Sequence, residues 1–322
     1  MPAASLPRVL VIRGGAIGDF ILTLPAIRLL RENIPQARIE VLGYKPIIAL
    51  ALADGVADAI QSLEHASMAR LFAPLAPTEG PLADYFRSFK LVVSYLYDPD
   101  GHFRGNMERI GVKTFLECPH RVVEGQGHAA EQLALPLERL AMYLENPAPR
   151  ITVEDDADMG TERPTIAVHP GSGSLKKNLP LEHWVAAVRR ITKDYPQARL
   201  ALITGEAEHE RGITARLVQA WAGLDFLHWD QQALPLLAGR LGRTTAFLGH
   251  DSGISHLAAA CGVPCLLFFG PTDPLTWAPR NAGVQVTRAT GGDLEKLPLE
   301  IALGEMQRFL DGLALKIAAP PL

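Results

Sequence analysis

The sequence predicts an α/β protein built from two Rossmann-like domains. Three observations support this prediction. Short apolar runs alternate, in both halves of the chain, with segments whose apolar residues recur at helical spacing. Several of the apolar runs end in glycine-containing loops, such as Gly14-Gly15 and Asp251-Ser252-Gly253. The alternation is interrupted by Asn146-Pro147-Ala148-Pro149 and the acidic run Glu154-Asp155-Asp156, a composition typical of a linker.

The first half begins with a strand-helix-strand unit. Val9 to Arg13 is a short apolar strand, Phe20 to Arg31 has helical periodicity, and Arg38 to Leu42 is again strand-like. Lys90 to Tyr97 indicates another buried strand, and Glu131 to Leu144 carries leucines at helical spacing. We therefore expect a first domain at residues 1–155.

The second half repeats the pattern, which predicts a second domain at residues 163–298. A final helix at Leu299 to Leu310 opens a C-terminal segment, residues 299–322, that we expect to return to the first domain. The predicted strands are Thr165 to Val168, Arg199 to Thr204, Thr245 to Leu248 and Cys265 to Phe269, and the predicted helices are Leu181 to Asp194 and Glu208 to Trp221.

Composition restricts the class of protein. The 322 residues are 48% hydrophobic and 20% charged, with a formal net charge of −4, as in ordinary globular proteins. Basic residues are spread over both halves, so we expect no nucleic-acid partner. Cys118, Cys261 and Cys265 are too few for a disulfide framework or a zinc site, which favours a reducing compartment such as the cytoplasm. No secretory signal pattern and no run of 18 apolar residues is found, so we expect neither export by that route nor a membrane span.

Two strand ends in the second half suit a sugar diphosphate. One apolar strand stops at Asp251-Ser252-Gly253, where a helix of small residues opens at about Ser252. The first N–H groups of that helix and its dipole favour an anion, and Gly253 permits close approach. The next strand stops at Gly270-Pro271-Thr272-Asp273-Pro274. Polar loops at neighbouring strand ends predict a ligand crevice at this edge of the sheet.

Other chemistries fit the residues poorly. The loop Arg13-Gly14-Gly15-Ala16-Ile17-Gly18 has arginine where a dinucleotide fingerprint has its first glycine. Asp251, Ser252 and His256 are triad residue types, but no Gly-x-Ser-x-Gly elbow surrounds them. Asp98-Pro99-Asp100 could be a metal-binding Asp-x-Asp, although a turn after a strand is the more common use of such residues. We expect no metal and no cofactor.

Three ordered segments resemble glycosyltransferase family 9, the bacterial heptosyltransferases. They are the opening strand, glycine turn and Thr-x-Pro-Ala helix from Arg8 to Leu30, the loop His169-Pro170-Gly171-Ser172-Gly173 with Lys177 before Pro180, and the run from Asp251 to Pro274. The resemblance implies a GT-B architecture, with two Rossmann-like domains facing across a cleft. It also implies inverting transfer of a heptose from an ADP-sugar donor to a lipopolysaccharide-type glycan.

Asp19 falls on the family's catalytic aspartate. The resemblance implies that its carboxylate accepts the proton of the attacking hydroxyl. A helix N-terminus favours the charged carboxylate and weakens it as a base, so a mainly electrostatic role at an oxocarbenium-like transition state is also open. Considered alone, an aspartate in this position is most often a helix cap.

Ser172, Gly173 and Lys177 are implied to bind the diphosphate and stabilise the leaving group. Lys176 is an alternative to Lys177, because the spacing depends on which end of the loop is aligned. A solvated turn is the ordinary interpretation of such a glycine-serine segment. Leu179 stands where the family has tryptophan.

Two more sets of residues complete the implied donor site. Glu208 and Glu210, of which Glu210 is the better match, resemble the ribose-binding residues, although acidic residues at a helix start are also stabilising for ordinary reasons. The remaining donor contacts implied are Asp251, Ser252, Gly253, His256 and Thr272.

The acceptor side carries the weakest signal. Arg104, Arg109 and Arg121 could bind an anionic glycan or lipid-linked acceptor, or could be solvated surface charges. A lipid-linked acceptor would bring the protein to the inner membrane face. A nucleotide-sugar epimerase of the same architecture and a non-catalytic nucleotide-sugar-binding homologue are the alternative functions.

Overall fold

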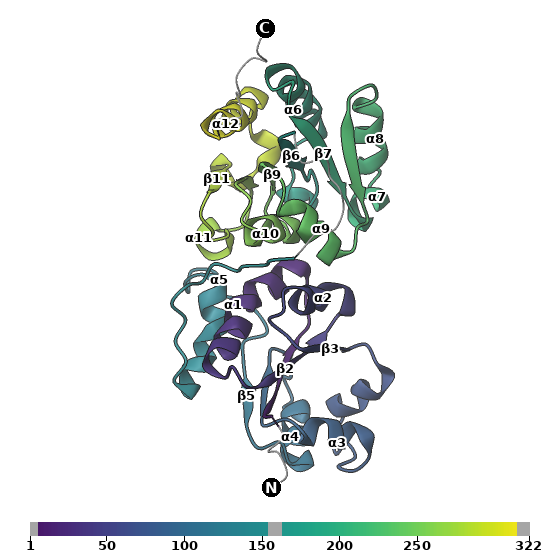
Figure 1. Cartoon of the computed structure of the whole chain (residues 1–322), viewed down its shortest axis with the longest axis vertical. Helices are drawn as coiled ribbons and strands as arrows, with labels where there is room; N and C mark the ends of the chain where they lie inside the picture. Colours follow the sequence, from purple (N-terminus) through teal and green to yellow (C-terminus); the bar gives the residue numbers. More distant parts are fainter. Residues whose placement is uncertain (1–5, 154–162, 314–322) are drawn as a thin grey trace. The chain divides into compact units, whose positions relative to one another are not determined.

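The computed structural model describes residues 6–153 and 163–313, and the chain divides into two compact units, residues 1–148 and 149–322. The acidic run Glu154-Asp155-Asp156 and the tail from residue 314 lie outside the described residues. Each unit contains one parallel sheet with helices packed around it (Figure 1). The predicted α/β class is confirmed. No helix in the described ranges is long and apolar enough to cross a membrane.

The N-terminal unit has a five-stranded sheet in the order β3-β2-β1-β4-β5. Its central strand is almost completely buried, as expected for a parallel sheet covered on both faces. Helix α1 packs against α2 and α5, and a separate cluster of apolar side chains, including Phe86 and Phe103, fills the space under α3 and α4. The strands are β1 (Arg8–Arg13), β2 (Arg38–Gly43), β3 (Ala59–Ser62), β4 (Leu91–Ser94) and β5 (Phe115–Glu117), and the helices are α1 (Ile17–Asn33), α2 (Lys45–Ala53), η1 (Ala66–Phe72), α3 (Pro81–Arg87), α4 (His102–Ile110), α5 (Ala129–Ala134) and η2 (Leu135–Leu140).

The C-terminal unit has a six-stranded sheet in the order β11-β10-β9-β6-β7-β8. The strands are β6 (Thr165–Val168), β7 (Arg199–Thr204), β8 (Phe226–Asp230), β9 (Ala246–His250), β10 (Cys265–Phe269) and β11 (Val284–Arg288). The helices are η3 (Leu175–Lys177), α6 (Leu181–Asp194), α7 (Glu206–Glu210), α8 (Ile213–Ala220), α9 (Leu234–Leu241), α10 (Gly253–Ala260), α11 (Pro274–Trp277), η4 (Thr290–Gly292), η5 (Leu294–Lys296) and α12 (Leu299–Gly312).

Residues 149–153 and α12 both pack within the C-terminal unit. Ile151 donates a backbone hydrogen bond to Ala260, and Asn281 donates to the carbonyl of Pro149. Helix α12 packs against α6, and Tyr195 donates a 2.7 Å hydrogen bond to Asp311 across this contact. The last described helix is therefore anchored to the core that also carries β6.

Both sheets reverse their strand order at one point. In the N-terminal unit the reversal lies between β1 and β4, and in the C-terminal unit it lies between β6 and β9. The carboxyl ends of the strands at such a point are where open α/β sheets bind ligands. The loops after β1, β4, β6 and β9 are thus the places to look for functional side chains.

Two predicted helices are shorter than the periodicity suggests. The helix expected at Glu131 to Leu144 stops at Ala134 and continues as a 3₁₀ turn, because Pro136 lacks the N–H that an α-helix needs and would clash with the preceding turn. The helix expected at Glu208 to Trp221 is split into α7 and α8 by Gly212, whose φ is +66°. In both cases a proline or a glycine, and not the spacing of the apolar residues, determines where the helix ends.

Candidate active site

Asp19 lies in the first turn of α1, directly after the loop that follows β1. Its Oδ2 accepts a 3.0 Å hydrogen bond from the backbone N–H of Ala16. Gly15 makes this contact possible, since its φ is +101° and a Cβ there would lie 2.9 Å from Asp19 Oδ2. The carboxylate is therefore bound at one oxygen, as the helix-cap interpretation expects, while its side chain stays 36% exposed.

Arg13 holds the other oxygen of that carboxylate. Its guanidinium is buried at the end of β1, with Nη2 3.5 Å from Asp19 Oδ1 and Nη1 donating a 3.3 Å hydrogen bond to the carbonyl of His120. The cation also lies 5.5 Å from the centre of the Tyr95 ring. Burial lowers the pKa of Arg13, and the charge of Asp19 opposes this. An exposed carboxylate edge in a fixed orientation can accept a proton or stabilise a developing cation.

A second polar cluster gathers around Asp251 at the end of β9. Its Oδ2 accepts hydrogen bonds from Lys177 Nζ at 2.6 Å and Thr272 Oγ1 at 2.7 Å. Asp251 is 7% exposed on its side chain and Lys177 28%. His256 Nε2 lies 3.9 Å from Asp251 Oδ1. A buried carboxylate therefore orients an ammonium whose remaining N–H groups can bind an anion.

The N-terminus of α10 lies next to this cluster. Ser252 is the N-cap, and its Oγ accepts a 3.2 Å hydrogen bond from the N–H of Ser255. Gly253 is the first helical residue, which confirms the predicted helix start. The same Ser252 Oγ lies 3.3 Å from His169 Nδ1, so α10 is joined to the loop after β6.

The loop after β6 is fixed by Glu208 of α7. The carboxylate accepts a 2.8 Å hydrogen bond from the N–H of Gly205, and its Oε2 lies 3.9 Å from His169 Nε2. Burial acts to raise the pKa of Glu208, but His169 and the Gly205 N–H outweigh it and hold the pKa below its ordinary value. Gly171 packs against this carboxylate with no room for a side chain. Glu208 thus supports the loop through these contacts, and its ribose contact stays a prediction.

The glycine-serine segment predicted to bind phosphate is held by two further hydrogen-bonding groups. Ser172 Oγ donates to Asn178 Oδ1 at 2.6 Å, and the Arg211 guanidinium donates to the carbonyls of Ser172 and Gly173 at 2.7 and 3.1 Å. The segment is therefore ordered by its own unit. Lys176 is exposed, whereas Lys177 points to Asp251.

His250 is a buried residue of this site that sequence reasoning missed. Its Nε2 accepts a 2.9 Å hydrogen bond from the N–H of Leu179, and Trp184 packs edge-on against the ring at 5.2 Å. Burial, with a further contribution from His169, lowers the pKa of His250 to about 3. A neutral imidazole thus joins the end of β9 to the segment that carries Lys177. The available signal was a histidine ending an otherwise apolar strand.

Several predicted residues lie apart from these clusters. Glu210 is exposed on α7. Arg104 pairs with Glu108 and Glu117, while Arg109 donates to the carbonyl of Ala76 and to Asn106. Arg121 is exposed. Across the residues that the structure describes, no group of three or more histidine, cysteine, aspartate or glutamate side chains is arranged to hold a metal ion.

Two α/β units, each with a parallel sheet and polar residues at its topological switch point, make up an architecture that solved structures share. The glycosyltransferase family 9 structure from Veillonella parvula DSM 2008 has a TM-score of 0.75 at 16% identity, covering 97% of this chain and 98% of that one. E. coli heptosyltransferase WaaC, solved with ADP, has a TM-score of 0.68 at 19% identity, covering 96% and 100%. These likenesses show the fold, which is GT-B.

The family is shown by the sequence itself. The model of glycosyltransferase family 9 (heptosyltransferase) matches residues 116–299, which is more than half of the chain. Lipopolysaccharide heptosyltransferase 3 of Escherichia coli is 21% identical over 313 residues, covering 87% of this chain and 88% of that relative. Lipopolysaccharide heptosyltransferase 1 of Pseudomonas aeruginosa is 24% identical over 291 residues, covering 83% and 79%. The chain belongs to glycosyltransferase family 9 and is a glycosyltransferase.

Proposed function

We propose that the protein transfers a heptose from an ADP-sugar donor to a lipopolysaccharide-type glycan, with inversion at the anomeric carbon. The observation that carries this proposal is the cluster of Lys177, Asp251 and Thr272 beside the N-terminus of α10. It supplies an oriented cation and the first N–H groups of a helix at one strand end. This combination suits a diphosphate whose negative charge grows as the glycosidic bond breaks.

The donor contacts follow from this arrangement. Lys177 and the first N–H groups of α10 at Ser252 and Gly253 bind the diphosphate oxygens, with Ser172 and Gly173 closing the site from the loop after β6. Thr272 lies beside the diphosphate and holds Asp251 through its hydroxyl. Asp251 keeps the ammonium oriented, and His256 supports Asp251. Because Lys177 is bound to a buried carboxylate in advance, little side-chain entropy is lost when the donor binds.

Asp19 acts on the acceptor in this reaction. Its exposed carboxylate edge accepts the proton of the acceptor hydroxyl as that oxygen attacks the anomeric carbon from the face opposite the diphosphate. A single displacement of this kind inverts the anomeric configuration.

Partners and location are part of the same proposal. The relatives named above are lipopolysaccharide heptosyltransferases, and WaaC was solved with ADP. By analogy, the partners are an ADP-sugar and an anionic or lipid-linked glycan. The protein would work in the cytoplasm, with peripheral contact at the inner membrane face where such an acceptor lies.

The test is a transfer assay with ADP-heptose and lipopolysaccharide core acceptors, read as ADP release and as the anomeric configuration of the product. Asp19→Asn should lower transfer roughly 10²- to 10⁴-fold and leave ADP binding intact. The matched control is Asp84→Asn, which neutralises an exposed carboxylate on α3 and should leave transfer unchanged. Donor conversion without acceptor would indicate an epimerase, and ADP binding without turnover would indicate a non-catalytic homologue. Transfer by Asp19→Asn at the wild-type rate would reject Asp19 as the general base.

A further inference from the structure

Arg211 holds two successive carbonyl groups of the loop after β6. It occupies the C-cap position of α7, and its side chain is half-buried. Nη1 donates a 2.7 Å hydrogen bond to the carbonyl of Ser172, and Nη2 donates a 3.1 Å hydrogen bond to the carbonyl of Gly173. A planar guanidinium can bind two acceptors in this way because its donors form a rigid fork. One side chain thus fixes two peptide groups of the loop.

The place of Arg211 depends on the break between α7 and α8. Gly212 has a φ of +66°, a conformation that residues other than glycine seldom adopt. Arg211 itself has left the helical conformation, with φ −90° and ψ 2°. In the single helix that apolar spacing predicted from Glu208 to Trp221, Arg211 would be an interior residue. The break makes it a terminal residue whose side chain meets the loop.

The two hydrogen bonds also determine which way the neighbouring N–H groups point. The peptide bonds of the described residues are trans, so the C=O and the N–H of one peptide group point in opposite directions. The carbonyl of Ser172 and the N–H of Gly173 belong to one peptide group. Since Arg211 binds that carbonyl, the N–H of Gly173 points away from Arg211.

The N–H of Gly173 is available to a ligand. It makes no hydrogen bond with any residue in the described ranges, whereas the next N–H along, that of Ser174, donates to Ser172 Oγ at 3.3 Å. Gly173 is exposed, and a Cβ built on it would meet no atom within 4 Å. Backbone N–H groups bordering open space bind anions, whereas carbonyl oxygens there would repel them. Arg211 keeps the two carbonyls turned away from that space.

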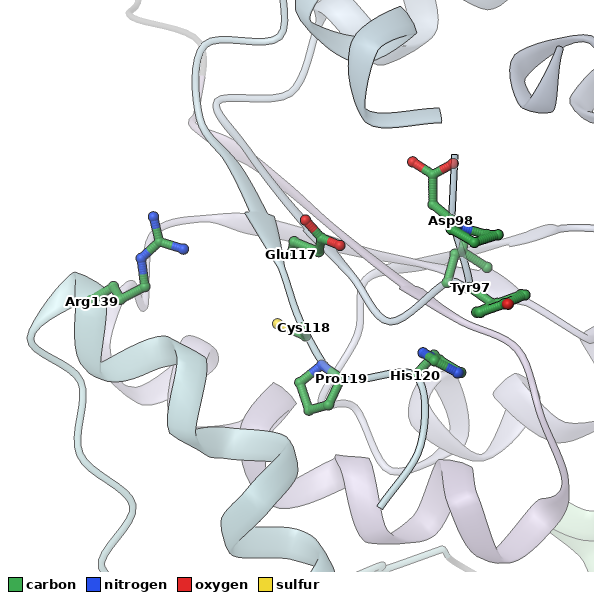
Figure 2. Close-up of a pocket in the computed structure, with 9 residues that line it drawn as sticks. Tyr97, Asp98, Glu117, Cys118, Pro119, His120 and Arg139 are labelled. Carbon is green, nitrogen blue, oxygen red and sulfur yellow. The ribbon is translucent and has the colours of Figure 1, made fainter. Parts of the chain in front are cut away.

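The N-terminal unit holds a loop in a similar way. There the Arg13 guanidinium donates to the carbonyl of His120 at 3.3 Å. His120 lies on the segment after β5, beside a cavity of about 510 Å³ whose wall also includes Cys118 and Pro119 (Figure 2). In both units an arginine therefore binds loop carbonyls at the carboxyl edge of the sheet.

We infer that Arg211 is a positioning residue for the diphosphate of the donor. It acts through the peptide group between Ser172 and Gly173, whose N–H it directs to the side where a phosphate oxygen binds. The forked guanidinium is required, because one group must hold two carbonyls at once. The inference rests on the proposed function for the identity of the donor, but the binding of ADP does not depend on transfer.

The test compares ADP with adenosine by isothermal titration of the full-length protein. Wild-type protein should bind ADP more tightly than adenosine. Arg211→Gln should weaken ADP roughly 10- to 100-fold and adenosine by less than about threefold, because only ADP carries phosphates. Arg211→Lys should resemble Arg211→Gln, since an ammonium keeps the charge and lacks the fork. Wild-type ADP affinity in Arg211→Lys would assign the effect to charge alone and overturn the inference.

A second measurement follows the N–H group itself by NMR of protein containing ¹⁵N-labelled glycine. The amide signal of Gly173 is identified by its absence from the spectrum of Gly173→Ala. Saturating ADP should shift this signal in wild-type protein and leave it nearly unchanged in Arg211→Gln. An equal shift in both proteins would show that the N–H is oriented without Arg211, and would overturn the inference.

Arg216→Gln is the matched control, because Arg216 is an exposed arginine of α8 that lies 3.5 Å from Glu182. It should bind both ligands as wild type does. Thermal unfolding checks that each variant is folded, and Arg211→Lys decides the outcome if Arg211→Gln is not. Equal loss of ADP and adenosine binding in the folded Arg211 variants, or no loss of either, would overturn the inference and leave the proposed transfer standing. An Arg211-dependent preference for ADP in a protein without transfer activity would do the reverse.

Discussion

The imidazole of His250 accepts the backbone N–H of Leu179 at 2.9 Å, which ties the end of β9 to the segment carrying Lys177. Asp251 follows His250 directly in the chain, and Lys177 lies two residues before Leu179. The hydrogen bond therefore holds together the two short segments of chain that carry the partners of the Lys177–Asp251 ion pair. The acceptor nitrogen must be unprotonated for this bond to exist.

We predict that His250 makes folding stability depend on pH. Burial lowers the pKa of His250 to about 3, against an ordinary value of 6.5. The unfolded chain therefore binds a proton below pH 6.5 that the folded chain does not, so this contribution is fully present above pH 6.5 and is lost as pH falls towards 3. The free energy of unfolding should decrease by about 1.4 kcal/mol per pH unit in that window.

His250→Gln separates this titration from the hydrogen bond, because a glutamine oxygen can accept the same N–H but does not titrate. Denaturant unfolding at pH 7.0 and pH 5.0 should give a smaller pH difference for His250→Gln than for wild type. An equal difference in both proteins would assign the pH dependence to other groups.

The two neighbouring lysines make a second prediction. Lys177→Met should weaken ADP binding roughly 10- to 100-fold, because the ammonium that faces the diphosphate is lost. Lys176→Met should change ADP binding by less than about threefold, as expected for an exposed side chain. Isothermal titration of both variants decides between the two alignments of the loop. A larger effect at Lys176 would reverse the assignment.

The sequence predicted the central strands of both sheets because a buried parallel strand is a continuous apolar run that ends in a recognisable loop. It did not predict the edge strands β3, β5, β8 and β11, which are only partly buried. The apolar runs ending at Arg13, Val168 and Phe269 are β1, β6 and β10 in the structure. The glycine-containing loops could also be recognised in the sequence. In the structure, Gly15 and Gly171 occupy positions where a side chain would clash, which explains why glycine stands there. Patterns of this kind depend only on residues that are neighbours in the sequence, so the sequence alone is enough to recognise them.

Partners across long sequence separations could not be predicted in this way. The family resemblance implied a ribose contact for Glu208, but it gave no sign that this carboxylate faces His169. Arg104 looked available, but it is neutralised by Glu108 and Glu117, the second of which comes from β5. Which charged side chains form ion pairs depends on the order of the strands in the sheet. A local sequence pattern contains no information about that order.

The third prediction concerns Arg13, which pairs with Asp19 and donates to the carbonyl of His120. Lysine at this position keeps the charge but lacks the planar fork, so it cannot bind both Asp19 and the carbonyl of His120 in the same way. Arg13→Lys should lower kcat for transfer roughly 10- to 100-fold with ADP affinity unchanged. Steady-state kinetics with ADP titration would test this, and an effect confined to ADP affinity would contradict a role through Asp19.

The last prediction concerns two glycines of the loop after β6. A Cβ at Gly171 would lie 1.7 Å from Glu208 Oε1, whereas a Cβ at Gly173 would meet no atom within 4 Å. Gly171→Ala should therefore displace Glu208 and lower the free energy of unfolding by about 1–3 kcal/mol, as overpacking in a close-packed region does. Gly173→Ala should leave stability within about 0.5 kcal/mol of wild type.

Gly173→Ala should nevertheless weaken ADP if the backbone of this loop binds the diphosphate, because the added methyl group stands where phosphate oxygens approach. Thermal unfolding of the two variants measures the effect of each glycine on stability. ADP titration measures its effect on donor binding. A stable Gly173→Ala protein with wild-type ADP affinity would remove the glycine-serine segment from the donor site and leave the diphosphate to Lys177 and the start of α10.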